Sequence, residues 1–312
     1  MASEQESSGS ASAVYGRAAA PQVALPRRGV AIGLCWSGVE GAGNRIVAAR
    51  LECGPERARL TKVWRPFTDA PGRRDIRARF APWLAEELRW AEGKLTVGVD
   101  FALSLAETHL RQLGLLRQGL KGPAALGKAL EEKYLTEASD FTTGAAKLRA
   151  ELGGDRPRVT DCYRAELHPP TSARTNRRTF FGLVTLARLD AAFPPWDPPR
   201  PGAPTIVEVR PHHVARSLFG VSGLREEPRE TAARASARAT LLRTLRAAAR
   251  LEFEMEVAAP VIQDAEGDSL DAVLSAVAAG AAWEAGFNGV PANVPRCEGW
   301  IHSVREESWR ER

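Results

Sequence analysis

The hydrophobic pattern in the first third of the chain predicts three short strands in succession. An apolar run over residues 30–34 leads into a glycine-rich turn, and a second apolar run returns over residues 45–51. Residues 59–64 can form a third strand, which would complete an antiparallel meander. Because the turn between the first two strands is rich in glycine, we expect the tip of this hairpin to approach a ligand.

The pattern then changes to helical and back to extended. Residues 73–91 place apolar side chains at helical spacing with charged residues between them, which predicts an amphipathic helix that can kink or divide at Pro82. A fourth strand follows over residues 94–100 and ends at Asp100, and a fifth is predicted over residues 205–210. This order of elements indicates an α/β fold.

The remaining segments differ in character. Residues 103–204 are mostly helical patterns that end in a proline-rich stretch, so they are interpreted as a helical insertion and a stiff connector. Residues 1–28 are rich in Ser, Ala, Gly and Gln without apolar periodicity, which predicts a disordered tail. The folded domain is therefore expected to span residues 29–312.

A long helix is predicted over residues 230–257. Several of its arginines recur at multiples of four residues: Arg234, Arg238, Arg246 and Arg250. A solvated helix face explains this row better than a nucleic-acid groove does.

Composition is that of a soluble globular protein. The chain has 312 residues, of which 44% are hydrophobic and 26% charged, and no apolar run approaches the roughly 20 residues of a bilayer span. The N-terminus lacks the apolar stretch of a signal peptide, so we expect a cytoplasmic protein without a membrane partner. The net charge of +5 permits a polyanionic partner, although an arginine-rich composition accounts for much of it. Nothing in the sequence indicates the oligomeric state.

The cysteines are too sparse for a disulfide framework and show no CxxC spacing of a zinc site. They are expected to be buried thiols: Cys35, Cys53, Cys162 and Cys297.

Five short segments, taken in order, resemble domain-of-unknown-function family 429, a family of predicted RNase H-like nucleases. They cover residues 30–38, 97–101, 206–211, 268–272 and 298–301. The resemblance extends over nearly the whole chain and implies an RNase H-like mixed sheet, with three antiparallel strands followed by parallel strands and flanking helices. It also implies that the fourth strand pairs parallel beside the first, which would bring Asp100 opposite position 35. The carboxyl ends of such strands are where open α/β sheets usually bind ligands.

The resemblance implies a divalent metal site for Mg²⁺ or Mn²⁺ and hydrolysis of nucleic-acid phosphodiesters. The carboxylates that would hold the ion and act in catalysis are Asp100, Glu208, Asp268 and Asp271. Cys35 stands where the family has an aspartate. A thiol is a soft ligand that is mostly protonated near neutral pH, so Cys35 is expected to weaken metal binding and impair catalysis. Glu40, in the glycine-rich turn, is a hypothetical substitute.

Each carboxylate also has an ordinary structural interpretation. Asp100 can begin a turn, and Asp268 and Asp271 suit the N-cap and first turn of the helix that follows. Glu208 lies inside an apolar strand, where the alternative to a metal is an ion pair with an arginine. His212 and His213 follow this strand, and if they continued it, at most one could join the site.

The hairpin turn is the predicted contact with the substrate. Glycine backbone there can cradle a phosphate, and the residues concerned are Ser37, Gly38, Gly41 and Gly43. The prediction that follows is a metal-dependent nuclease impaired by Cys35. Two alternatives stay open: an inactive nucleic-acid-binding module, and a nucleotide- or phosphate-binding protein similar to the actin-like ATPases, which use a related hairpin. The sequence does not separate DNA from RNA.

Overall fold

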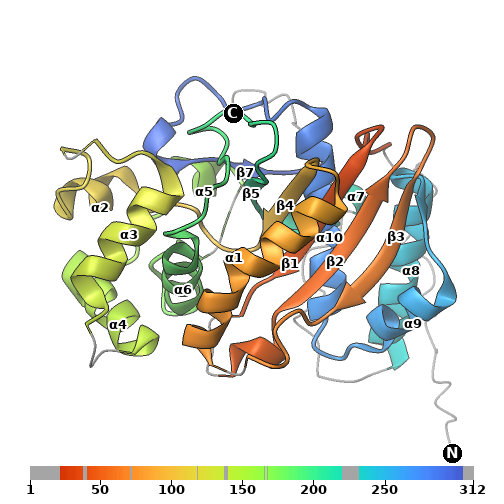
Figure 1. The fold of residues 1–312 in the computed structure, drawn as a ribbon, viewed down its shortest axis with the longest axis horizontal. Coiled ribbons are helices and arrows are strands. Elements are labelled where there is room, and N and C mark those ends of the chain that lie inside the picture. The colour runs from red at the N-terminus through yellow and green to blue at the C-terminus, as the bar shows by residue number, and fades with distance from the viewer. Residues whose placement is uncertain are drawn as a thin grey trace, which may run out of the picture.

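The structure is a computed structural model that describes residues 22–37, 41–70, 72–117, 119–136, 140–164, 166, 168–219 and 232–304. Within these residues a single sheet has the strand order β6-β3-β2-β1-β4-β5-β7 (Figure 1). The strands are β1 (Gly29–Cys35), β2 (Val47–Cys53), β3 (Ala58–Trp64), β4 (Leu95–Val99), β5 (Thr205–Val209), β6 (Leu251–Glu252) and β7 (Ile301–His302).

The sheet has the predicted RNase H-like arrangement. Strands β1, β2 and β3 form an antiparallel meander, while β4 pairs parallel to β1 and β5 pairs parallel to β4. The short strands β7 and β6 extend the sheet by parallel pairing with β5 and β3. In the register of the central strands, Leu34 lies beside Val99, and Val99 lies beside Glu208. The residues that follow these positions therefore meet at one edge of the sheet, which confirms the predicted fold class.

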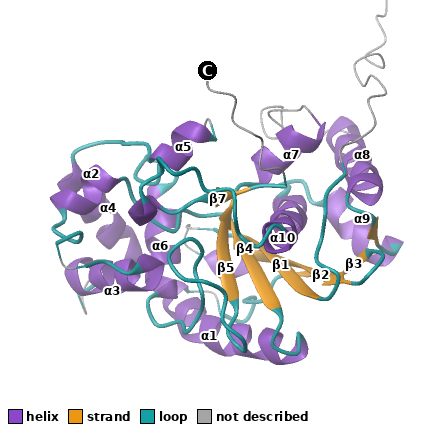
Figure 2. Cartoon of the chain, turned by 90° about the horizontal axis from the view of Figure 1, so that it is seen from above, coloured by secondary structure: helices purple, strands orange, loops and turns teal. Residues whose placement is uncertain are grey.

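Helices cover both faces of the sheet (Figure 2). The helices are α1 (Arg73–Trp90), α2 (Glu107–Gln112), α3 (Gly122–Tyr134), α4 (Phe141–Leu152), α5 (Val159–Tyr163), α6 (Asn176–Leu186), α7 (Pro211–Phe219), α8 (Ala232–Ala248), α9 (Met255–Gln263) and α10 (Asp268–Glu284). Alternate strand residues face opposite layers, as the two-residue period of a strand requires. Ile32 and Leu34 pack in the core beneath α1 and α6, whereas Ala31 and Cys35 pack in the core beneath α10.

The contact between α10 and β1 is close enough to require glycine. A Cβ atom on Gly33 would lie 2.0 Å from the carbonyl oxygen of Ala272 and 2.2 Å from the backbone nitrogen of Ala276. Gly98, on β4, would bring a Cβ atom within 2.5 Å of the Ser275 carbonyl oxygen. Two neighbouring strands therefore approach the helix backbone directly, and this places the first turn of α10 beside the carboxyl ends of β1 and β4.

Helices of the predicted insertion gather away from the meander. Helices α2, α3 and α4 lie at the end of the molecule opposite α8 and α9, in both views (Figures 1 and 2). Helix α6 connects them to the sheet, because its Phe180, Phe181 and Leu183 are buried in the same core as the strand residues of β4. Helix α1 runs unbroken through Pro82, so the proline neither divides it nor ends it.

The predicted long helix over residues 230–257 is wrong in its second half. Helix α8 ends at Ala248, and Arg250 adopts a positive φ of 47° that no helix can continue through. Leu251 then pairs with Ala58 of β3, and the chain begins a separate helix, α9. Residues 230 and 231 lie outside the described part of the chain.

The solvated arginine face predicted for that helix is also only partly correct. Arg246 and Arg250 are exposed, but Arg238 is buried and its Nε atom donates a hydrogen bond of 2.7 Å to the carbonyl oxygen of Ile262. This bond satisfies a carbonyl at the end of α9, so Arg238 joins two helices.

Two other predictions need correction. The packed chain begins before Gly29, because Val23 is buried and its backbone nitrogen donates to the carbonyl oxygen of Ala248 at 2.7 Å. Residues 1–21 of the predicted tail lie outside the described residues. All four cysteines are thiols, but only Cys35 and Cys53 are buried, whereas Cys162 is exposed and Cys297 is half-buried.

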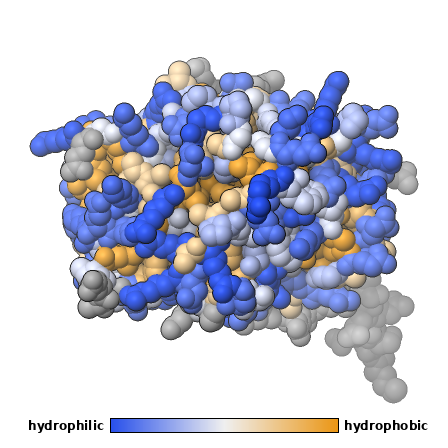
Figure 3. All heavy atoms as spheres, viewed as in Figure 1, coloured by the Kyte–Doolittle hydropathy of each residue, from blue (hydrophilic) through white to orange (hydrophobic). Residues whose placement is uncertain are grey.

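Hydrophilic side chains are spread over the face of the molecule seen in Figure 3, with smaller apolar areas between them. Among the described helices, none combines the length and the apolar character needed to cross a membrane.

The contact between β1 and α10 can be tested by adding one methyl group. We expect Gly33→Ala to lower the free energy of unfolding by about 3 kcal/mol, because the helix backbone must move away. Gly202→Ala is the control, since its Cβ atom would meet nothing within 4 Å and only its left-handed backbone costs stability, about 1 kcal/mol. Urea denaturation measures both, and equal losses would contradict the close contact.

Candidate metal centre

Three elements bring ligand atoms together at the carboxyl edge of the sheet. Cys35 is the last residue of β1, Asp100 directly follows β4, and Asp271 lies in the first turn of α10. The Sγ atom and one carboxylate oxygen from each aspartate all lie within 4.8 Å of one another. Cys35 and Asp100 are buried, and Asp271 is half-buried. This group can hold a metal ion.

Asp268 lies beside the cluster rather than in it. The Sγ atom of Cys35 lies 3.5 Å from the Oδ1 atom of Asp268, a distance that suits a weak hydrogen bond from the thiol. Gly267 is the N-cap of α10, so Asp268 is the first helical residue and does not act as the predicted N-cap. Of the helix pair, Asp271 therefore belongs to the group of candidate ligands, and Asp268 contacts Cys35 from outside that group.

Asp100 is held by two arginines. Arg178, on α6, donates from Nη1 to Oδ2 at 2.8 Å, and Nη1 of Arg210 lies 3.6 Å from Oδ1. The Arg178 side chain is 23% exposed, whereas that of Arg210 is 4% exposed. A carboxylate offers about four lone pairs, so Asp100 can bind these cations and still accept a metal ion.

Glu208 is committed to other partners. Its carboxylate is fully buried and receives both Nη atoms of Arg158, at 2.6 and 2.7 Å. The Nη2 atom of Arg210 lies 2.9 Å from Oε1, and the backbone nitrogen of Leu103 donates to Oε2 at 2.8 Å. These four contacts use the lone pairs of both oxygens, so the ion-pair interpretation describes Glu208. The structure does not bring Glu208 into the group formed by Cys35, Asp100 and Asp271.

Arg158 is the centre of this buried network. Besides Glu208, its guanidinium binds Asp161 at 2.6 Å, and all three side chains are at most 1% exposed. Burial lowers the pKa of Arg158, but the charges of Asp161 and Glu208 raise it more, so its pKa is well above the ordinary value. The ion pairs thus compensate for the cost of burying the charges.

The segment at residues 298–301 has a structural role. One oxygen of Glu298 accepts a hydrogen bond from the backbone nitrogen of Glu107 at 2.7 Å, and the other accepts one from the backbone nitrogen of Val159. These nitrogens begin α2 and α5, where backbone donors have no partner within the helix. Burial raises the pKa of Glu298 despite these bonds.

Comparison with known proteins agrees with the sequence motifs. A family model described as "Protein of unknown function (DUF429)" matches residues 38–296, well over half of the chain. The chain belongs to the DUF429 family. No curated protein and no solved structure matches it. The matched range of this DUF429 protein includes Asp100 and Asp271 and begins just after Cys35.

The predicted hairpin is formed by β1 and β2, but the glycines between these strands have different surroundings. Gly41 has a left-handed backbone with φ of 71° and open space around it. Gly43 is buried, and a Cβ atom there would lie 2.2 Å from the Ala70 carbonyl oxygen, so its close approach is to the protein's own backbone. Ser37 is half-buried at the end of β1. Gly38 and Glu40 lie outside the described residues.

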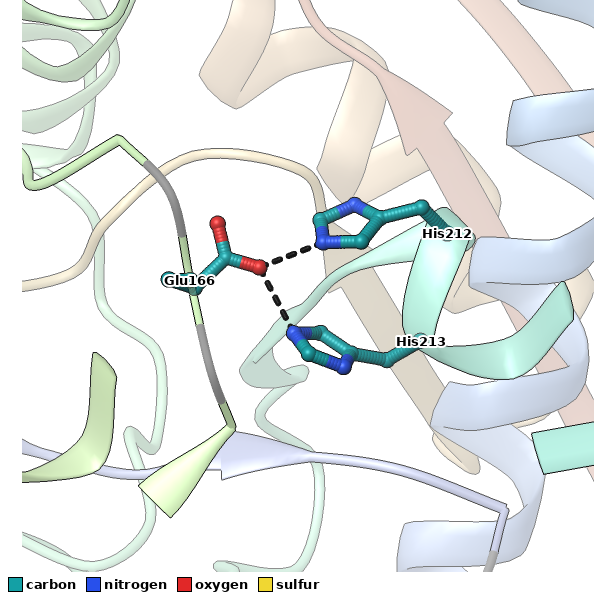
Figure 4. A group of neighbouring side chains, drawn as sticks. All are labelled: Glu166, His212 and His213. Atoms are coloured by element: carbon teal, nitrogen blue, oxygen red, sulfur yellow. Dashed lines mark hydrogen bonds and ion pairs between the residues drawn. The ribbon is translucent and has the colours of Figure 1, made fainter. Parts of the chain in front are cut away.

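The histidines of the DUF429 protein do not continue a strand. Pro211 begins α7, so His212 and His213 lie in the first turn of a helix, and the argument that they face opposite sides does not apply. Both rings contact Glu166 (Figure 4).

Sequence reasoning missed the charged residues that surround the candidate ligands of this DUF429 protein. They are Arg158, Asp161, Glu166, Arg178 and Arg210. All but the last come from the region interpreted as an insertion, and Arg158 lies 50 residues from its partner Glu208 in the chain. Because the sequence is rich in arginine, no pattern distinguishes Arg158 or Arg178. Arg210 had a signal, because it directly follows the strand that contains Glu208.

The buried network makes a prediction for stability. We expect Arg158→Met to lower the free energy of unfolding by about 3–5 kcal/mol, because it leaves Glu208 and Asp161 buried with less compensating charge. Arg188→Met is the control, since Arg188 is 77% exposed in its ion pair with Glu131 and should cost less than about 1 kcal/mol. Chemical denaturation compares them, and a similar small loss in both would show that the network does not hold the fold.

Proposed function

We propose that this protein binds a divalent metal ion between Asp100, Asp271 and Cys35 and hydrolyses nucleic-acid phosphodiesters, with activity weakened by Cys35. The observation that carries this proposal is the convergence of the three ligand atoms within 4.8 Å at the carboxyl edge of the sheet. Such an ion, when bound, polarises a phosphate oxygen and lowers the pKa of a bound water.

The donor set fits Mn²⁺ better than Mg²⁺. Mg²⁺ demands oxygen ligands in nearly ideal octahedral geometry, and here one of three protein ligands is a thiol. Mn²⁺ also prefers carboxylates, but as a first-row transition-metal ion it accepts nitrogen and sulfur ligands better than Mg²⁺ does. Asp100 and Asp271 would supply the hard oxygens, and Cys35 would reduce affinity relative to an aspartate.

The surroundings of the site support an anionic substrate. Arg178 contacts Asp100 and is partly exposed, so its guanidinium can also bind a phosphate oxygen that approaches the ion. Arg210, on the other side of Asp100, is buried and fixed by Glu208 as well. In this proposal Arg178 binds the substrate and Arg210 positions Asp100. The net charge of +5 favours a polyanion in general.

A binding module without turnover is the second candidate. It is favoured by the thiol at position 35 and by the arginine contacts of Asp100, because both reduce the attraction of the site for a metal ion. The actin-like alternative gains no support from Gly43, whose packing against Phe67 and Ala70 leaves no room for a phosphate at that residue.

Metal binding can be tested by thermal unfolding with Mn²⁺ and with Mg²⁺. We expect Mn²⁺ to raise the Tm of the natural protein, both ions to raise the Tm of Cys35→Asp, and neither to raise that of Asp100→Asn. At a hundredfold excess over Kd the gain is about 2.7 kcal/mol, or roughly 5 °C in Tm. Asp190→Asn, at a side chain 86% exposed, is the control and should behave as the natural protein. The absence of any shift in Cys35→Asp would exclude this metal site.

Activity is tested on single- and double-stranded DNA and RNA with Mn²⁺. Cys35→Asp should cleave faster than the natural protein, and Asp100→Asn should not cleave. Salt-dependent nucleic-acid binding without cleavage in both the natural protein and Cys35→Asp would instead support the binding module.

A further inference from the structure

A second group of metal-ligating side chains lies next to the first, at the end of β5. His212 and His213 open helix α7, and Glu166 comes from the segment after α5. The Nε2 atoms of the histidines lie 2.5 and 2.6 Å from the same oxygen, Oε1 of Glu166. Figure 4 shows both rings turned toward this carboxylate from one side.

We propose that Glu166, His212 and His213 bind a divalent transition-metal ion, with Zn²⁺ as the favoured ion. Two imidazole nitrogens and one carboxylate oxygen are the protein ligands of a known class of zinc site that keeps a further position for water or substrate. Imidazole also suits other late transition metals, whereas Mg²⁺ and Ca²⁺ prefer oxygen ligands. This site is separate from the one between Asp100, Asp271 and Cys35, and the proposal does not depend on the function proposed for that site.

The present distances are those of a closed, hydrogen-bonded form of the site. Ligand atoms around a tetrahedral zinc ion at about 2.0–2.1 Å are roughly 3.3 Å apart. The two Nε2–Oε1 distances therefore need to lengthen by less than about 1 Å each, by movement of His212 and a small rotation of the Glu166 carboxylate. His212 can make this movement because its side chain is 49% exposed, while Glu166 and His213 are each 7% exposed and hold the inner side of the site.

The charge states suit a metal ion. Burial raises the pKa of Glu166, but the hydrogen bonds from both histidines and the charge of Arg210 lower it further, so its pKa is well below the ordinary value and it remains a carboxylate. Burial lowers the pKa of His213, which favours the neutral imidazole that metals require. Metal binding would require the Nε2 proton of each histidine to leave, because in the hydrogen-bonded form Nε2 donates to Glu166.

Arg210 connects this site with the first one. Its Nε atom lies 3.7 Å from Oε2 of Glu166, and the same guanidinium lies 3.6 Å from Asp100. Since Oε2 faces Arg210 and Oε1 faces the histidines, Arg210 orients the carboxylate in the way that outer partners orient metal ligands. Glu166 and Asp100 therefore contact the same guanidinium, so an ion bound by Glu166 would lie close to the proposed nuclease site.

Co²⁺ titration of the full-length protein, followed by visible absorption, tests the proposal, with Zn²⁺ then added to displace Co²⁺. We expect one equivalent of Co²⁺ to bind with the spectrum of a nitrogen- and oxygen-ligated ion, and Zn²⁺ to abolish it. His212→Ala should weaken Zn²⁺ affinity at least tenfold, and since the side chain is half exposed, this variant should keep the Tm of the metal-free natural protein. Glu166→Gln provides a second ligand variant. His168→Ala is the matched control, because this histidine contacts Arg174 outside the cluster.

The same titration on Asp100→Asn separates the two sites. Binding that persists in Asp100→Asn and is lost in His212→Ala supports the proposal, even if the Mn²⁺ experiments on the first site fail. A thiolate-to-cobalt charge-transfer band that disappears in Asp100→Asn would assign the ion to the Cys35 site instead. Equal affinity in His212→Ala and the natural protein, or no binding, would overturn the proposal and leave Glu166 as an ion-pair partner only.

Discussion

The buried guanidinium of Arg158 is the interaction on which the functional edge of this protein depends. It binds Glu208 inside the sheet and Asp161 in α5 with contacts of 2.6 Å to each, and none of the three side chains is more than 1% exposed. A carboxylate in the interior of a strand costs several kcal/mol unless a cation compensates it. The contacts of Arg158 with Asp161 and Glu208 therefore hold α5, and the segment after it that carries Glu166, against the end of β5. These segments are far apart in the sequence.

A second constraint, the packing of α10 on β1, fixes the other half of the edge. Gly33 and Gly98 let two strands contact the backbone of α10, and this close contact fixes the position of the start of α10 over the sheet. Asp271 then lies beside Cys35 and Asp100 as a consequence of this packing. Arg210 joins the two halves, since it contacts Asp100, Glu208 and Glu166 together.

The sequence predicts the longer strands well because strand periodicity is a local rule. The resemblance to the DUF429 motifs implies the parallel pairing that places Asp100 beside position 35, and it places the start of α10 there too. It fails where partners come from distant segments. Nothing in the chain indicates that Arg158 and not another arginine would reach Glu208, or that Pro211 would begin a helix and turn both His212 and His213 toward Glu166. The break at Arg250 was also hidden, because the helical pattern continues past it while the backbone does not.

Cys35 changes the balance between stability and metal binding at this edge. With an aspartate at that position, three carboxylates would face one another near Asp268, and in a buried site such repulsion is relieved only by a cation or by protonation. The Sγ atom of Cys35 lies 3.5 Å from Asp268, where a thiol donates a hydrogen bond and an aspartate would repel. Arg178 and Arg210 already compensate Asp100. Asp100 is thus already compensated without a metal ion, and an ion that binds there must compete with two arginines and gains only two carboxylates. This argues that affinity at the first site is limited by charge rather than by geometry. At the second site Arg210 also lies 3.7 Å from the one carboxylate, but two of the three ligands are imidazoles, so binding there depends less on carboxylate charge.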